Sequence, residues 1–187
     1  MMKSKQKKVD TMSLKEKLYY YGDKGIQIVE LPYKDDYMSA VIILPNELEN
    51  INDYISDLDD DKLQKLIKKM SPQLVQLELP KFQFDFDITF NSHLQNMGMV
   101  LPFRDESDFS GIVADPTVYI SNVIQKSFLS VDEQGTEASS DTSETISTRG
   151  MPHFEPMFVN RPFLFMLRNK KFHLNYEMLF MAKVEKL

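Results

Sequence analysis

Apolar residues recur with the two-residue period of β-strands over most of this chain. Continuous or alternating apolar runs predict strands over Leu18–Tyr21, Ile26–Tyr33 and Tyr37–Leu44. The run Ala40–Leu44 has no polar residue, which is typical of a strand that is covered on both faces. The polar residues 34–36 between the second and third strands predict a hairpin turn.

Three later segments have the 3.6-residue period of helices. Residues 50–58 and 60–70 are the two longer predicted helices, and Asp and Lys residues of the second complement the dipole at its two ends. Residues 90–97 predict a shorter helix that stops at Gly98. The second helix has one apolar stripe, formed by Leu63, Leu66, Ile67 and Met70.

Between the helices, the strand period changes phase once. Val75–Leu79 alternates up to Pro80, and Phe82, Phe84 and Phe86 alternate after Lys81. This shift predicts a strand that bends and passes from one sheet into another. We interpret the phenylalanine stripe as part of the core, since stacked aromatic side chains usually pack there.

The last third of the chain contains three further strand predictions. Thr117–Val131 has the pattern of a long strand. Met157–Leu167 and Met178–Glu185 are apolar and predict a hairpin that is buried near the centre of the fold.

The segment between these strands has an unusual composition. From Thr136 to Thr148 it is almost entirely Thr, Ser, Ala, Asp and Glu, without Pro or Gly. Flexible linkers normally contain Gly or Pro. Because Ser and Thr are small and Thr favours strands, the segment fits an exposed loop and also fits a strand in a sheet.

One basic residue stands alone in this segment. Arg149 is the only Lys or Arg between Lys126 and Arg161, and Gly150 follows it. A long exposed loop with a single Arg is a target for trypsin-like proteases, whose specificity pocket holds an Asp. The alternative is a solvated surface loop that proteases cut incidentally.

Several motifs, all in the expected order, resemble the serpin family. The segment 133–138, with Glu133, Gly135, Thr136, Glu137 and Ala138, resembles the hinge of that family, and Met157–Leu167 resembles its signature around Asn-Arg-Pro-Phe. Further matching blocks are Glu30–Tyr33, Leu44–Asn46, Leu79–Phe82, Leu94–Met99, Asp108–Gly111 and Leu179–Val184. The resemblance covers nearly the whole chain, from Val9 to Val184.

The resemblance implies a suicide-substrate inhibitor of serine proteases. In serpins a protease attacks the reactive-centre loop and forms an acyl-enzyme, and the cut loop then inserts into a large sheet and distorts the protease. The family places the scissile residue fourteen positions after the hinge glycine, and this register leads from Gly135 to Arg149. The implied reactive site is therefore the Arg149–Gly150 bond. Arg149 is also the residue that the composition singles out.

The resemblance also implies an α+β, serpin-like multi-sheet fold, mostly β with a few short helices. Serpins have about twice this length, so we expect residues 1–187 to form a single partial domain, the C-terminal half of a truncated serpin. Its parts would be a basic tail at 1–8, the reactive-centre loop at 132–156 and buried C-terminal strands at 157–187. The strand opposite the insertion gap belongs to the other half, so a missing N-terminal half or a strand-exchange oligomer is the expected partner.

Two alternatives to inhibition remain open from the sequence. The chain could be a non-inhibitory serpin-like interaction protein, or a truncated fragment that proteases only cleave as a substrate. In an inserted loop most residues facing the underside of the sheet are small, but Glu144 would bury a carboxylate, which is costly without a partner.

Composition narrows the possible functions. The net charge of −6 argues against a nucleic-acid partner, and no apolar run reaches the ~20 residues of a membrane-spanning helix. The chain has no cysteine, and His93, His153 and His173 have no metal-ligand spacing, so we expect neither a cofactor nor an enzyme.

The same resemblance suggests an extracellular location. Residues 1–8 are not followed by the apolar core of a secretory signal, so a cytoplasmic location also stays open. Some serpins bind heparin-like polyanions through basic helices. We interpret Lys62, Lys65 and Lys69, which share one helix face, as a solvated face balanced by neighbouring Asp residues.

Overall fold

A computed structural model of the chain describes residues 9–34, 37–46, 51–113, 118–133, 152–170 and 177–185. The strands are β1 (Thr11–Gly22), β2 (Ile26–Pro32), β3 (Met38–Pro45), β4 (Ser71–Pro80), β5 (Phe82–Thr89), β6 (Ile124–Val131), β7 (Glu155–Phe158), β8 (Phe163–Asn169) and β9 (Glu177–Val184). The helices are α1 (Ile51–Asp57), α2 (Asp60–Lys69), α3 (Asn91–Asn96) and a short 3-10 helix (Leu101–Phe103). The structure consists mostly of strands with a few short helices, which is the α+β fold class that the sequence predicts.

The described residues form two compact units. One unit comprises the described parts of 1–82 and 131–187, and the other comprises those of 83–130. The first unit contains a seven-stranded sheet in the order β7-β4-β1-β2-β3-β8-β9. Its neighbouring strands are antiparallel except β4 and β7, which are parallel. The second sheet has two strands, β5 and β6.

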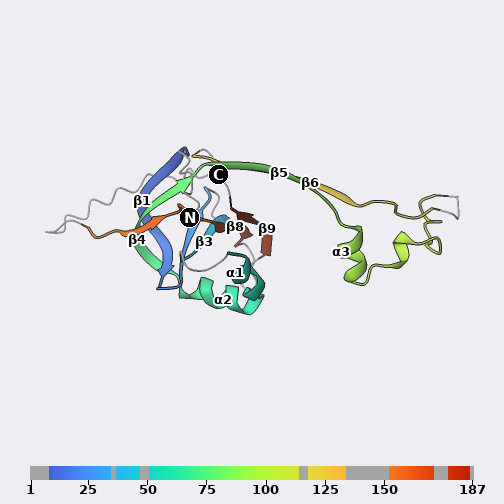
Figure 1. The fold of residues 1–187 in the computed structure, drawn as a ribbon, viewed down its shortest axis with the longest axis horizontal. Helices are drawn as coiled ribbons and strands as arrows, with labels where there is room; N and C mark the ends of the chain where they lie inside the picture. The colour runs from blue at the N-terminus through green and yellow to red at the C-terminus, as the bar shows by residue number, and fades with distance from the viewer. Residues whose placement is uncertain are drawn as a thin grey trace, which may run out of the picture. The chain divides into compact units, whose positions relative to one another are not determined.

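One core cluster of the first unit lies between the seven-stranded sheet and the two longer helices. Figure 1 shows α1 and α2 lying together beside the β8 and β9 end of the sheet. The buried apolar stripe of α2 packs against inward-facing residues of β2, β3 and β8. This cluster comprises Ile26, Ile28, Val41, Ile43, Ile51, Leu63, Leu66, Ile67, Met70, Leu164 and Met166. Each such fully buried side chain stabilises the fold by roughly 1.5–3 kcal/mol relative to exposure.

A side-chain cap fixes the start of α2. Asp59 has extended backbone angles, and its Oδ1 accepts a hydrogen bond of 2.7 Å from the backbone N–H of Lys62. The cap satisfies one of the amides that a helix N-terminus leaves without an intrahelical partner.

We expect Asp59→Ala to destabilise the first unit by about 1 kcal/mol, because the Lys62 amide loses its acceptor. Urea unfolding followed by circular dichroism measures the loss, and hydrogen exchange at the Lys62 amide locates it. Asp59→Asn is the matched control, since an asparagine side chain also accepts this bond and should behave like the unaltered protein. Equal losses in the two variants would contradict the capping role.

The phenylalanine stripe is only partly buried. Phe82 is buried and lies edge-to-face against Phe163 and Phe165, with ring centroids 5.5 Å apart in both pairs. Phe84 is half-buried and Phe86 is exposed. The interpretation of the whole stripe as core is therefore wrong for Phe86, because alternation along a strand does not reveal how far a covering layer extends.

The C-terminal strands differ in a similar way. The sequence predicted that both would be buried, and β8 is buried over most of its length. In contrast, β9 forms one edge of the seven-stranded sheet and exposes Met178, Leu179 and Met181. The expectation of burial is wrong for β9, because hydrophobicity alone does not reveal which strand lies at an edge.

Two strand boundaries also differ from the prediction. Strand β1 starts seven residues before the predicted Leu18, because the register with β4 continues to the pair Thr11 and Pro80. Strand β6 starts at Ile124 rather than Thr117. The backbone just before it bonds to Asn91 instead, which donates to the Ser121 carbonyl (2.7 Å) and accepts from the Val123 amide (2.8 Å).

Helix α3 ends where the sequence indicated. Gly98 follows it with a φ of 99°, in the left-handed region that glycine adopts without strain.

Candidate functional site

The described part of the predicted hinge is anchored by an ion pair. Strand β6 ends at the buried Val131, and two residues later Glu133 Oε2 lies 2.7 Å from Lys81 Nζ. Lys81 sits between the last residue of β4 and the first residue of β5, and its backbone N–H donates to the Asp10 carbonyl at 2.8 Å. The backbone bond holds the lysine at this corner, so the ion pair ties the start of the loop to the end of β4.

Both partners of this ion pair have shifted pKa values. The side-chain hydrogen bond between them raises the pKa of Lys81 and lowers the pKa of Glu133. The stability that ionised Glu133 gives the folded state is therefore present above its unfolded pKa and is lost as pH falls through the lowered folded pKa. The stability that protonated Lys81 gives is present below its unfolded pKa and is lost as pH rises through the raised folded pKa. The pair is intact across neutral pH.

We expect Lys81→Glu to increase hydrogen exchange at residues 131–133 by about threefold, because both side chains are partly exposed and such pairs are weak. The double variant Lys81→Glu/Glu133→Lys should restore the original rate, since it keeps the pair with reversed signs. High salt should reduce the difference. A double variant that exchanges as fast as the single one would show that the attraction between the side chains does not hold the hinge.

The far end of the predicted loop is also attached to β4. Strand β7 starts at Glu155, within the predicted loop range of 132–156, and pairs in parallel with β4 from Val75 to Glu78. His153 precedes this strand and Glu155 is its first residue, and His153 Nε2 lies 3.5 Å from Glu155 Oε1. The described residues on the two sides of the segment 134–151 are thus both attached at β4, through the pair of Glu133 with Lys81 and through the pairing of β7.

The remaining predicted site residues lie outside the described residues. They are Gly135, Thr136, Glu137 and Ala138 of the hinge and Arg149 and Gly150 of the reactive site. Of the predicted set, the structure places Glu133 only.

A buried ionic network in the first unit was not anticipated from the sequence. Glu30 Oε1 lies 2.6 Å from Arg168 Nη2 and 2.7 Å from Lys170 Nζ, and Arg168 Nε donates to Ser39 Oγ at 3.0 Å. The network joins β2, β3 and β8, and Glu30, Ser39 and Arg168 are buried. A glutamate inside the apolar run Ile26–Leu31 was the available signal, because such a position needs a cation.

The pKa of Glu30 reflects two opposing effects. Burial raises it, but hydrogen bonds from Arg168, Lys170 and Ser39 outweigh burial and lower the pKa below its ordinary value. The carboxylate is therefore charged at neutral pH and is matched by the two cations.

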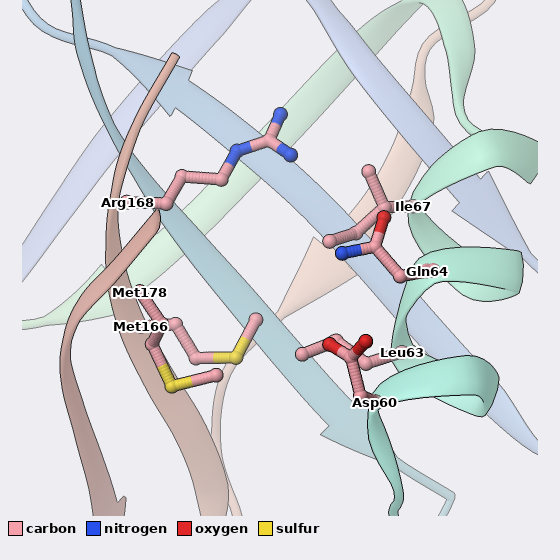
Figure 2. A pocket seen from close by; sticks show the side chains of 7 residues that line it. All are labelled: Asp60, Leu63, Gln64, Ile67, Met166, Arg168 and Met178. Carbon is pink, nitrogen blue, oxygen red and sulfur yellow. The ribbon is translucent and has the colours of Figure 1, made fainter. Parts of the chain in front are cut away.

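Next to Arg168 lies a small cavity between α2 and the end of the sheet. In Figure 2, Met166 and Met178 lie side by side on β8 and β9 and face α2. The cavity has a volume of about 50 Å³ and is lined by Asp60, Leu63, Gln64, Ile67, Met166, Arg168 and Met178. It is several times smaller than the pockets of about 300–1,000 Å³ that bind drug-sized ligands.

The basic face of α2 is occupied by local contacts. Lys65 Nζ lies 2.7 Å from Asp61 Oδ2, and Lys62 Nζ donates to the Asp57 carbonyl at 2.5 Å. Lys69 Nζ lies 5.0 Å from the ring centroid of Tyr21. These contacts agree with the interpretation of a solvated, locally balanced face.

Among the described residues, no cluster of three or more His, Asp or Glu side chains could hold a metal ion. No helix in the described ranges is long and apolar enough to cross a membrane.

Comparison with known proteins identifies the class. The sequence profile of the family described as "Serpin (serine protease inhibitor)" matches residues 1–187. The chain is 38% identical over 177 residues to a leukocyte elastase inhibitor of Xenopus laevis, covering 89% of this chain and 46% of that protein. It is 34% identical over 165 residues to Iripin-5 of Ixodes ricinus, covering 86% and 42%.

Solved structures agree with the sequence comparison. The native state of the thermophilic serpin Tengpin matches with a TM-score of 0.77 and 35% identity, covering 97% of this chain and 47% of that one. Serpin48 of the insect Tenebrio molitor matches with a TM-score of 0.72 and 32% identity, covering 96% and 46%. The chain belongs to the serpin family, and it spans about half the length of the relatives that it matches.

Proposed function

We propose that this chain carries the reactive part of a serine protease inhibitor that acts on trypsin-like proteases, with Arg149–Gly150 as the scissile bond. The observation that carries the proposal is the anchored hinge, where Glu133 is held to Lys81 two residues after β6 ends. A loop that starts at a fixed point on a strand can be presented to a protease and can also continue that strand alongside the sheet.

The proposed chemistry follows from the acyl-transfer mechanism of serine proteases. The serine Oγ attacks the carbonyl carbon of Arg149, and the Arg149–Gly150 bond breaks as the amine of Gly150 takes a proton from the catalytic histidine. The new ester joins the protease to residue 149. Insertion of residues 134–149 beside β6 would then separate the parts of the protease active site before water hydrolyses the ester.

Incubation with trypsin tests the proposal. We expect a band on a denaturing gel at the summed mass of trypsin and residues 1–149, because the ester survives denaturation. A protein cut after Arg149 should also unfold at a higher temperature than the intact protein, since an inserted strand adds hydrogen bonds and buried area. Clean cleavage at Arg149 with neither result would contradict inhibition.

A substrate-only or non-inhibitory interaction role is the second candidate. The observation that favours it is the two-stranded sheet β5–β6. Among the described residues β6 has β5 as its one neighbour, so no described strand would flank an inserted loop on its other side. By family resemblance we propose action outside the cell, with the cytoplasm as the alternative.

A further inference from the structure

The short strand β7, which follows the proposed reactive segment, is held by a side chain from a strand that is not its neighbour. Strand β7 has four residues and forms one edge of the seven-stranded sheet, with β4 beside it. The Gln27 side-chain amide Nε2 donates a hydrogen bond of 2.9 Å to the Pro156 carbonyl in β7. Gln27 belongs to β2, and β4 and β1 lie between β7 and β2 in the strand order. The bond therefore adds an attachment that the pairing of β7 with β4 does not supply.

Tyr20 fixes the orientation of this amide. Gln27 Nε2 also donates to Tyr20 Oη at 2.8 Å, and the Tyr20 side chain is 5% exposed. A side-chain amide carries two N–H groups on one nitrogen, so both bonds can exist at the same time. With one N–H on a buried hydroxyl and the other on the Pro156 carbonyl, the Gln27 side chain has little freedom to turn away from β7.

Gly22 leaves the space that this arrangement needs. It lies directly opposite Gln27 in the pairing of β1 with β2. A Cβ atom on Gly22 would lie 2.4 Å from Tyr20 Oη and 2.9 Å from Tyr20 Cζ, which is closer than such atoms approach without a shift. The absence of a side chain at Gly22 therefore lets the tyrosine hydroxyl lie where it meets the amide.

Chain length shows what the attachment of β7 can control. Gly150 precedes Glu155 by five residues, so an extended chain places it at most about 18 Å from the start of β7. A later attachment is Arg161, whose Nε donates to the Pro45 carbonyl at 2.7 Å. If β7 left β4, eleven residues would separate Gly150 from Arg161, and the limit would grow to about 40 Å.

We propose that Gln27 is a positioning residue for the scissile bond. Its amide keeps β7 on β4 and so confines the Arg149–Gly150 bond to a small region in which a protease can bind it. Gln27 acts through the Pro156 carbonyl and touches neither the protease nor the reacting atoms. A segment that is confined before binding loses less entropy when it binds, so Gln27 favours protease binding and leaves the chemical step unchanged. The inference rests on the proposed function.

Hydrogen exchange tests the attachment itself. Gln27→Leu keeps a side chain of similar size but removes both donated bonds. We expect exchange at the Met157 and Phe158 amides to become about fivefold faster, because the strand loses a side-chain hydrogen bond that helps to hold it. Exchange in β8 should stay unchanged. Gln73→Leu is the matched control, since the Gln73 amide bonds to Ser71 Oγ at 3.1 Å within β4, and it should leave exchange in β7 unchanged.

Single-turnover cleavage with trypsin in excess tests the positioning role. For Gln27→Leu, the half-saturating trypsin concentration for the cut after Arg149 should rise about threefold at an unchanged limiting rate, because the segment must then be ordered during binding. Gln27→Lys retains a donor that can reach both acceptors and should restore the original value. Tyr20→Phe removes one acceptor and should shift both measurements in the same direction as Gln27→Leu.

Each alternative result has a separate meaning. Unchanged exchange in β7 of Gln27→Leu would overturn the proposal, because the strand would not depend on this side chain. Faster exchange with an unchanged half-saturating concentration would also overturn it and would leave Gln27 a purely structural role. A first cut other than after Arg149 in the unaltered chain would overturn the proposed function and the positioning role with it. In that case the exchange result would still show whether Gln27 holds β7.

Discussion

Trypsin should cut Arg149→Gln in the segment 134–151 about 10⁴-fold more slowly than the unaltered chain, because a pocket built around a buried charge strongly rejects a side chain that lacks the matching group. Arg149 is the only basic residue between Lys126 and Arg161, so the variant leaves no second site there. Mass spectrometry of the first products, expected at 1–149 and 150–187, measures the effect. The covalent complex with trypsin should disappear to the same extent, since the ester forms at that carbonyl.

The control for this variant removes a basic residue elsewhere. Arg104→Gln deletes an exposed trypsin site in the second unit and should leave cleavage at 149 unchanged. Two neighbouring sites serve as internal references. Lys126 lies in β6, and Arg161 is held by a 2.7 Å bond from its Nε to the Pro45 carbonyl. If trypsin cuts first at either of these sites, or still cuts within 134–151 in the variant, Arg149 is not the preferred cleavage site.

The second large effect concerns stability. Arg168→Met should destabilise the first unit by about 3–5 kcal/mol, because it leaves the buried Glu30 carboxylate without its main partner. Of the two cations beside Glu30 in the structure, Lys170 then remains at 2.7 Å, and its side chain is partly exposed. The measurement is urea unfolding at neutral pH, followed by the circular dichroism of the sheet.

The double variant Glu30→Met/Arg168→Met separates charge from packing. The double variant should regain most of the unfolding free energy that Arg168→Met loses, since replacing a buried ion pair with apolar side chains of similar size is often neutral or stabilising. Lys170 can then turn toward solvent. If the double variant is as unstable as Arg168→Met, the loss comes from packing beside the cavity and not from the unpaired charge.

The pH dependence gives an independent check on the same network. The pKa of Glu30 is lowered in the folded protein, so its contribution is complete above the unfolded pKa and is lost as pH falls through the folded value. Glu30→Gln should remove this component of acid destabilisation. An unchanged acid transition in that variant would show that other carboxylates control it.

The elements that the sequence predicted well are those whose signal is local. The apolar stripe and the flanking Asp and Lys residues of α2 predicted a helix within one residue of the observed one. Gly98 marked the end of α3 because left-handed backbone is a property of a single residue. The family motifs likewise lie in short segments, so they indicated the family, which the comparisons confirm, without knowledge of any contact.

The errors have a common origin in contacts between distant residues. Strand β9 and Phe86 are as apolar as core residues, but their exposure depends on which segment lies next to them. The extra residues of β1 are in a strand because β4 pairs with them over ten residues. No pattern within β1 itself contains that information.

By itself, the sequence determined the family and the order of the strands and helices along the chain, and it predicts a hinge from Glu133 and a single arginine at Arg149. The tertiary structure alone decided that Lys81 pairs with Glu133, that Glu30 meets Arg168 across three strands, and that the described residues of 83–130 bury no hydrophobic side chain. The physical reason is that propensity and motif act over a few neighbouring residues, whereas burial and charge pairing depend on segments that only folding brings together.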